Sequence, residues 1–510
     1  MTTLAQRAVQ FLDRRSTPIL LAVAAGFALG QFLLFDESRY YEWDEAVYVS
    51  QASPGQNPLY FAATRARGIT LLVAPVTILT ESVTAIRIYL VIVSACALFL
   101  SFRVWMRVRP AVAPIGAALF GSTWIALFYG SEISPNLYSA LGGVALAGFF
   151  VRALTTPESR RLEAGNVVAA IVTGLFRPYD LGVIALGLAL GGIVTMRALG
   201  PGSSDRTWRS RVSIARGEIR TQAILAFAVV LGCVPWVVEQ SIRWGGPLEA
   251  LARAVRESNS VGLSGWGFHI PAHLAAANGP IFTYDTAAAI SRGGALWWAT
   301  WAILAAIGIG LAASRARRAV VVPLSGGLVA AVGYFFLTPI APRFLSPAYA
   351  LIALAAASGL YELLSRLATG SRGVLTTLAV ASIILGLLSA WHVRTGTTLE
   401  SDQAARRNDA RELGQVLISR TGGADCGVWA QFGYPQVALA SGCRGGSLDV
   451  NWTQPPEPLV KLAESTDHVY FLALSPPGPD SFLHGLPKTR VPVSRGGTWT
   501  LYVFTESTTP

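Results

Sequence analysis

The feature that most constrains this chain is a series of long apolar stretches. A helix that crosses a membrane needs about 20 predominantly apolar residues, and the sequence has about eleven stretches near that length. Only 14% of the residues are charged and 52% are hydrophobic, whereas about a quarter of a soluble protein is charged. We therefore predict a polytopic α-helical membrane protein. The predicted spans are residues 17–35, 84–106, 111–130, 135–153, 164–177, 179–198, 221–241, 294–313, 318–337, 344–365 and 373–391.

The placement of arginine predicts the orientation of these spans. The net charge of +11 comes almost entirely from arginine, and most of the arginines lie in short loops between apolar stretches. With about eleven spans, the clustered arginines share one side, which the positive-inside rule identifies as the cytoplasm. The N-terminus is then inside and the C-terminal tail outside. Residues 68–80 are too short to span, so we expect an interfacial or re-entrant segment. Positive charge distributed in this way argues against nucleic acid as a partner.

Composition divides the chain into two predicted domains. Residues 1–392 form the membrane domain, with a first outer loop at 36–83 and a long outer loop at 242–293. Residues 393–510 contain short apolar runs between Gly/Pro-rich segments, which predicts a small extracytoplasmic α/β domain. The sequence shows neither a glycine-rich phosphate loop nor a metal-ligand cluster, so we expect no cofactor and no metal.

Two of the four cysteines, Cys426 and Cys443, lie in the predicted C-terminal domain. An extracytoplasmic location permits a disulfide between them. Closing a loop of this size contributes about 3 kcal/mol to stability on the loop-entropy model. Two free thiols are the alternative.

Acidic residues gather in the first outer loop, just beyond the first span. The sequence Tyr41-Glu42-Trp43-Asp44-Glu45-Ala46-Val47-Tyr48 mixes carboxylates with aromatic rings. On a helix beginning near Trp43, Asp44 and Glu45 lie about 100° apart. One of them can then face a site while the other binds backbone or an arginine. A plain acidic helix N-terminus is the alternative.

A second outer acid, Glu132, lies in the turn between the third and fourth predicted spans. A carboxylate within hydrogen-bonding reach of an acceptor hydroxyl is what a general base requires. We therefore regard Asp44, Glu45 and Glu132 as candidate catalytic residues, with Asp44 as the base.

Several arginines on the predicted outer side break the positive-inside pattern. Charged side chains near span ends are usually paired or functional, and arginine is well shaped to bind phosphate through two parallel hydrogen bonds. Snorkelling to lipid headgroups is the alternative for each one singly. Together with the acids, they suggest a lipid phosphate held beside a carboxylate. The arginines are Arg65, Arg67, Arg87, Arg177, Arg243 and Arg343.

The acidic motif at 41–48 resembles the first-loop Asp-Glu motif of GT-C membrane glycosyltransferases. Within that family, the motif looks like those of the protein O-mannosyltransferases and the aminoarabinose transferases of lipid A. Residues 81–90, with Arg87, are similar to the family's arginine-led second span. Residues 131–136 resemble its second acidic turn, and 341–347 its late Arg-Phe/Tyr-x-x-Pro motif. The resemblance covers residues 1–391 in order and in sidedness.

This resemblance implies a polyprenyl-phosphate sugar donor and an acceptor hydroxyl outside the cytoplasmic membrane. Asp44 would be the general base and Glu132 would support the acceptor or the base. Arg65, Arg67 and Arg343 would hold the lipid phosphate, and Arg177 is added from its own position and charge. These relatives act without a nucleotide-site metal.

The sugar and the acceptor stay open in this interpretation. Mannose and arabinose suit the same scaffold, and the acceptor could be a protein, a polysaccharide or a glycolipid. A transporter or flippase of a lipid-linked sugar is the alternative function. Transporters commonly show inverted repeats and acids near the bilayer midplane, whereas here the acids gather at one surface and no repeat is visible.

Overall fold

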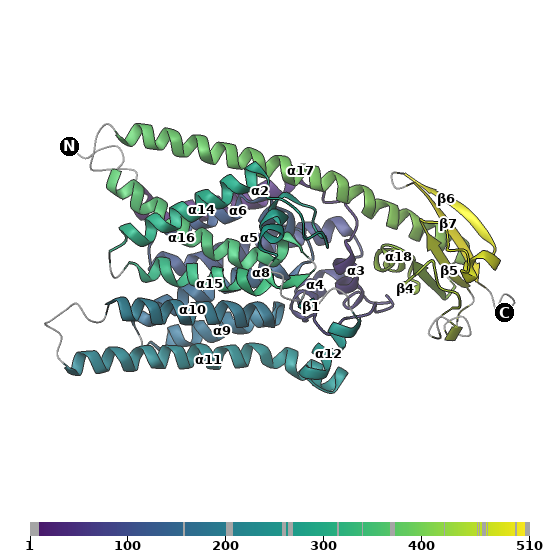
Figure 1. Ribbon diagram of the computed structural model, residues 1–510, viewed down its shortest axis with the longest axis horizontal. Helices are drawn as coiled ribbons and strands as arrows, with labels where there is room; N and C mark the ends of the chain where they lie inside the picture. The colour runs from purple at the N-terminus through teal and green to yellow at the C-terminus, as the bar shows by residue number, and fades with distance from the viewer. Residues whose placement is uncertain are drawn as a thin grey trace. The chain divides into compact units, whose positions relative to one another are not determined.

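The protein was analysed as a computed structural model, in which most of the chain is helical and a small sheet lies near the C-terminus (Figure 1). The structure describes residues 10–156, 159–199, 208–257, 262–263, 269–313, 316–338, 340–367, 373–422, 424–455, 457, 460–461, 466, 468–494 and 497–504.

Sequence signals account for several helix starts. Thr123 caps α7, because its Oγ1 accepts a hydrogen bond from the Ala126 N–H (3.2 Å), and Pro135 occupies the first turn of α8. Both residue types are favoured there because the first N–H groups of a helix lack intrahelical partners. The helices are α2 (Ser16–Leu34), α3 (Trp43–Ser50), α4 (Gly68–Thr77), α5 (Val83–Arg103), α6 (Val112–Gly121), α7 (Trp124–Gly130), α8 (Pro135–Thr155), α9 (Arg160–Phe176), α10 (Pro178–Leu199), α11 (Trp208–Trp244), α12 (Pro247–Glu257), α13 (Ile270–Ala275), α14 (Arg292–Leu311), α15 (Arg318–Phe335), α16 (Ser346–Leu367), α17 (Gly373–Thr421) and α18 (Tyr434–Ser441).

Eight helices in the described part of the chain are long and apolar enough to cross a membrane. The count becomes nine if α6 and α7, which meet at a bend of 78°, form one broken span. A helix or this bent pair covers each of the eleven predicted stretches, but α9 has only 17 residues and α17 runs on for 49 residues into a polar sequence. The multi-pass character is thus confirmed, whereas the span number and the orientation stay predictions. The short segment predicted at 68–80 forms the ten-residue helix α4.

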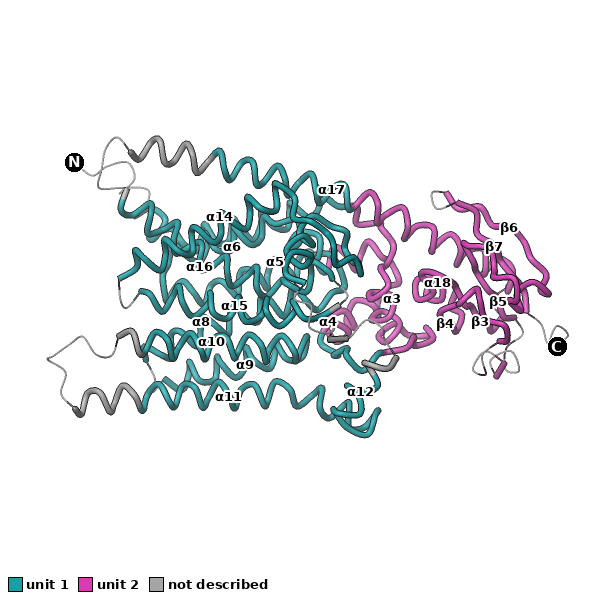
Figure 2. The backbone as a smooth tube through the Cα atoms, viewed as in Figure 1, with its two compact units in different colours: residues 1–35, 62–68, 90–399 teal, residues 36–61, 69–89, 400–510 magenta. Residues whose placement is uncertain are grey.

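The chain divides into two compact units (Figure 2). The first unit comprises residues 1–35, 62–68 and 90–399, and the second comprises 36–61, 69–89 and 400–510. The predicted division at residue 392 assigns the whole first outer loop, residues 36–83, to the membrane domain. In the structure, most of that loop instead packs with the C-terminal residues, chiefly through helices α3 and α18.

Helices α8 and α16 form the centre of the first unit. Their apolar windows are 83% buried inside the protein, compared with 22% for α2 and α11 and 28% for α14. Neighbouring helices approach each other closely at small residues, as is common between membrane helices. A Cβ added at Gly359 on α16 would lie 1.7 Å from the Leu304 carbonyl oxygen on α14. The poorly buried outer helices are the ones whose apolar surface lipid would cover.

The second unit contains a five-stranded mixed sheet of order β4-β3-β5-β7-β6. Strands β4, β3 and β5 are parallel, and β7 is antiparallel to both β5 and β6. The predicted apolar runs correspond to β3, β5 and β7. The two edge strands were not predicted, because their sequences RGGS and KTRVPV carry little apolar signal. The strands are β3 (Cys426–Ala430), β4 (Arg444–Ser447), β5 (His468–Ala473), β6 (Lys488–Val493) and β7 (Gly497–Phe504).

Cys426 and Cys443 form a disulfide in this sheet domain. Cys426 is the first residue of β3, and Cys443 directly precedes β4. Since β3 and β4 are neighbouring parallel strands, the bridge joins the N-terminal ends of these two strands.

Candidate active site

The acidic motif forms the start of helix α3, which begins at Trp43 as predicted. Glu42 is the N-cap residue, and its Oε2 accepts a hydrogen bond from the Asp44 N–H (2.8 Å). In return, Glu45 Oε2 accepts from the Glu42 N–H (2.8 Å). This reciprocal capping box satisfies donors that a helix start otherwise leaves unpaired. The local sequence therefore fixes the residue at which α3 begins.

Glu45 is also the centre of a buried ion-pair network. Its Oε1 accepts from Arg87 Nη1 (2.5 Å) and its Oε2 from Arg87 Nη2 (2.8 Å), a bidentate pairing. Arg407 Nη1 lies 3.4 Å from the same Oε2. All three side chains are at most 2% exposed. Glu45 thus bonds both an arginine and the backbone. This is the structural role expected for one of the two neighbouring acids. Arg87, the arginine it bonds, belongs to the second unit.

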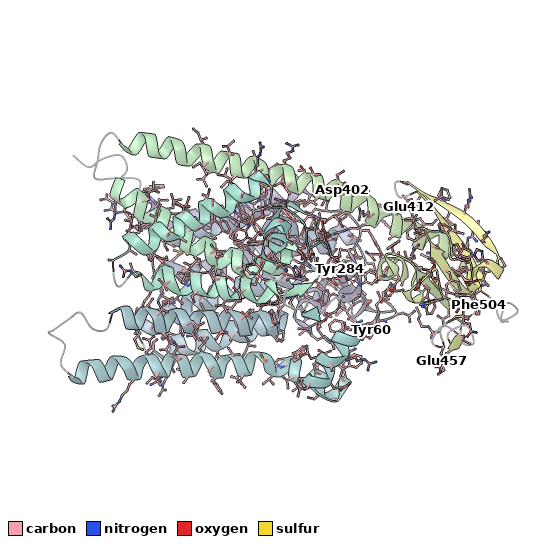
Figure 3. All side chains as sticks on the ribbon, viewed as in Figure 1. Tyr60, Tyr284, Asp402, Glu412, Glu457 and Phe504 are labelled. Atoms are coloured by element: carbon pink, nitrogen blue, oxygen red, sulfur yellow. A yellow bond between two sulfur atoms is a disulfide. The ribbon has the colours of Figure 1, made fainter. Side chains whose placement is uncertain are left out.

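We expect Glu45→Gln to destabilise the protein by about 3–5 kcal/mol, because it removes the buried carboxylate charge that pairs with Arg87 and Arg407. The matched control is Glu457→Gln, since Glu457 (Figure 3) pairs with Lys461 and both side chains are about 70% exposed. Such an exposed pair contributes about 0–1 kcal/mol. The measurement is the free energy of unfolding in detergent. Equal losses of unfolding free energy in the two variants would show that the buried Glu45 network stabilises the protein no more than an exposed ion pair does.

Asp44 differs from its acidic neighbours in its surroundings. It is half-buried, whereas Glu45 is 1% exposed, and the capping box uses the side chains of Glu42 and Glu45. Burial raises the pKa of Tyr40 and of Tyr41 well above the ordinary value for a phenol. These two tyrosines therefore stay protonated at neutral pH and cannot act as bases. Among these side chains, Asp44 is the best candidate to accept a proton.

In the first unit, the predicted break between two spans positions Arg177. This residue ends α9, and α10 begins at the following Pro178. The Arg177 Nε lies 3.1 Å from Asp180 Oδ2, and its Nη2 donates to the Tyr334 hydroxyl (2.8 Å). Asp180 is fully buried and also accepts hydrogen bonds from Ser139 Oγ (2.7 Å) and from Tyr334. The guanidinium group is thus held by Asp180 on α10 and by Tyr334 on α15.

Arg343 lies near Arg177 in space, although 166 residues separate them in the sequence. The Cζ of Arg177 lies 5.6 Å from the Phe344 ring centre and that of Arg343 lies 5.4 Å from it. Phe344 also stacks on Tyr334, with ring centres 5.5 Å apart. Cations favour the face of an aromatic ring electrostatically, so this ring brings two like charges together. Asp180 adds a carboxylate beside Arg177.

The remaining predicted residues also have defined places in the first unit. Arg67 Nε donates to Glu239 Oε1 (2.8 Å), which also accepts from Arg243 Nη1 (3.1 Å). Arg67 and Arg243 therefore belong to a second, partly neutralised arginine cluster. Arg65 is half-buried, and Glu132 is 2% exposed in the turn between α7 and α8. The four predicted residues, Arg65, Arg67, Arg243 and Glu132, lie in the first unit, whereas Asp44 and Glu45 lie in the second.

Sequence reasoning did not identify the groups that hold these arginines. Asp180, Tyr334 and Phe344 surround Arg177, and Arg407 reaches Glu45. One local signal was present, because Asp180 lies three residues after Arg177 and such pairs meet on a helix. Nothing in the sequence pattern marked Tyr334 or Arg407. In the described part of the chain, no group of three or more His, Cys, Asp or Glu side chains is arranged to hold a metal ion.

These features describe a multi-pass membrane protein with a small C-terminal sheet domain. No protein-family model matches the sequence, and no curated protein matches it. The structure is nevertheless similar to that of ArnT from Cupriavidus metallidurans bound to undecaprenyl phosphate, with a TM-score of 0.60 and 12% identity. This match covers 97% of the present chain and 99% of ArnT.

Two further solved structures share the fold. The archaeal oligosaccharyltransferase AglB from Archaeoglobus fulgidus, in complex with an inhibitory peptide and a dolichol-phosphate, matches with a TM-score of 0.52 and 13% identity, covering 89% of this chain and 69% of AglB. The arabinofuranosyltransferase AftD from Mycobacteria matches with a TM-score of 0.51 and 15% identity, covering 95% of this chain and 40% of AftD. All three are GT-C glycosyltransferases, so the resemblance drawn from the sequence is confirmed at the level of the fold.

Proposed function

We propose that the protein is a membrane glycosyltransferase. It moves a sugar from a polyprenyl-phosphate donor to an acceptor hydroxyl at the outer face of the cytoplasmic membrane. The observation that carries the proposal is the cluster of Arg177 and Arg343 around Phe344, in a fold shared with proteins solved with undecaprenyl phosphate and dolichol-phosphate. Two guanidinium groups beside one aromatic ring suit the phosphate of such a lipid.

The chemistry requires one base and one anion site. Asp44 takes the proton of the acceptor hydroxyl as its oxygen bonds to the anomeric carbon. The bond from that carbon to the phosphate oxygen breaks, and its electron pair leaves with the polyprenyl phosphate. The phosphate thereby gains negative charge, which Arg177 and Arg343 stabilise, with Arg65 and Arg67 as further candidate ligands. A single displacement of this kind inverts the anomeric centre.

Glu45 and Glu132 have supporting roles in this proposal. Glu45 acts through Arg87 and the capping box, so it is a positioning residue for the turn that carries Asp44. Glu132 is buried in an outer turn and supports the acceptor or the base. The sugar can be mannose, arabinose or another, and the acceptor can be a protein, a polysaccharide or a glycolipid.

The proposed function is tested with purified protein in lipid nanodiscs. Polyprenyl-phosphate sugars, each with a radiolabelled sugar, are offered with hydroxyl acceptors of the three classes. We expect the labelled sugar to appear on the acceptor. One free polyprenyl phosphate should be released for each sugar transferred. In proteoliposomes, movement of intact donor across the bilayer without cleavage would instead identify a flippase and overturn the proposal.

We expect turnover to persist in excess EDTA, because the arginines supply the positive charge that a metal would otherwise provide at the leaving phosphate. The measurement is the initial rate of transfer before and after chelation and dialysis. Loss of the rate on chelation, with recovery on addition of Mn²⁺ or Mg²⁺, would show that the reaction depends on a divalent ion.

A further inference from the structure

The short helix α18 of the sheet domain contacts the first residue of the acidic helix α3. With its amide assigned the orientation that satisfies both of its polar atoms, Gln436 accepts a hydrogen bond from the Trp43 N–H (3.0 Å) and donates to the Gly433 carbonyl oxygen (3.1 Å). The ring of Tyr434 meets the Trp43 ring edge to face, with centres 4.9 Å apart. Both contacts lie within the second compact unit.

These contacts complete the cap of α3. Glu42 accepts from the Asp44 N–H, but the Trp43 N–H has no acceptor in its own segment. Gln436 supplies that acceptor from nearly 400 residues further along the chain. One of the first-turn donors of the catalytic helix is therefore satisfied only by the sheet domain.

Helix α18 also contacts the loop that follows α3. Asn57 Nδ2 donates to the carbonyl oxygen of Gly442 (2.8 Å), and Gly442 is the residue that ends α18. In the first turn of α3, Arg407 from α17 reaches Glu45 Oε2 (3.4 Å). Residues contributed by the C-terminal part of the chain thus fix α3 at its first residue, at its first turn and in the loop that follows it.

We propose that the C-terminal sheet domain positions the catalytic base. Tyr434, Gln436 and Arg407 are positioning residues that set the place and direction of the first turn of α3, and hence of the Asp44 carboxylate. This inference rests on the proposed function of Asp44 as base. It gives the sheet domain a direct part in the reaction.

The test compares two substitutions of the same side chain. Gln436→Met keeps the length but removes the acceptor for the Trp43 N–H, whereas Gln436→Glu keeps an acceptor oxygen. Misplacing a catalytic group by about 1 Å can lower a rate about 100-fold, so Gln436→Met should lower kcat by about 10–100-fold and leave the KM for donor nearly unchanged. Gln436→Glu should recover most of the lost kcat.

A second arm separates positioning of Asp44 from general damage to the fold. In an Asp44→Asn background, Gln436→Met should cause no further loss, because both changes remove the same contribution and coupled residues are non-additive. The control within the domain is Glu412→Gln (Glu412 is labelled in Figure 3), since Glu412 bonds Ser494 (2.6 Å). It should leave kcat unchanged. A full additional loss in the Asp44→Asn background would overturn the inference.

Hydrogen–deuterium exchange tests the positioning without activity. Gln436→Met should speed exchange in the peptide that covers α3 and leave strand β5 as protected as in the wild type. Unchanged exchange in α3 would contradict the inference. If the wild-type protein transfers no sugar, the proposed function fails, and the exchange result still decides whether the sheet domain holds α3.

Discussion

Replacing Asp44 with asparagine is expected to lower kcat for sugar transfer by about 100–10,000-fold, the range that a positioned general base contributes. The amide side chain has nearly the same shape but cannot take the acceptor proton. The backbone contact that fixes the residue is retained, because the Asp44 N–H, and not its side chain, bonds Glu42. The KM for the polyprenyl-phosphate donor should change little, since the arginines hold the phosphate.

The matched control is Asp402→Asn on α17, an exposed aspartate outside the acidic motif (Figure 3). Initial rates at saturating donor and acceptor give kcat for both variants, and titration of donor gives KM. We expect wild-type kinetics for Asp402→Asn. Wild-type kcat in Asp44→Asn would show that another group takes the proton.

Removing either arginine beside Phe344 is expected to have the second largest effect. A donor that stabilises charge developing in a transition state contributes about 100–1,000-fold to kcat. We therefore expect Arg343→Gln and Arg177→Gln each to lower kcat by about that factor and also to weaken donor binding. Arg177→Lys should recover only part of the loss, because an ammonium group cannot make the paired contacts of the planar guanidinium.

Arg220→Gln is the control for this pair. Arg220 lies in the same compact unit and pairs with Glu163 (2.7 Å), but its side chain is 50% exposed. Binding of a fluorescent polyprenyl phosphate, measured alongside kcat, separates lost affinity from lost rate. If Arg177→Gln and Arg343→Gln bind the lipid phosphate and transfer sugar as well as Arg220→Gln does, the phosphate site lies elsewhere.

Local sequence signals predicted the local structure well. The helix start at Trp43 follows from a capping pattern within four residues, and the break at Pro178 follows from the missing N–H of proline. The apolar runs of β3, β5 and β7 were recognisable because these strands form the inside of the sheet domain. Each of these signals is carried by residues that are neighbours in the chain.

Contacts between distant residues were not predictable in the same way. Arg407 reaches Glu45 across 362 positions, and Tyr334 bonds Asp180 across 154. Hydrophobic periodicity shows which face of a helix is buried, but not which polar side chain of another helix lies opposite. A stray arginine could therefore be identified as unusual, while the partner that holds it could not. The same limit explains why the first outer loop was not assigned to the unit of the sheet domain.

The most direct test of the central claim is a stoichiometry measurement with wild type and Asp44→Asn side by side. Both proteins, in nanodiscs, receive a polyprenyl-phosphate sugar labelled in the sugar and in the phosphate. We predict that wild type releases one polyprenyl phosphate for each sugar joined to the acceptor, and that Asp44→Asn binds the donor but forms almost no product. Equal product from the two proteins, or sugar movement without cleavage of the donor, would contradict the account.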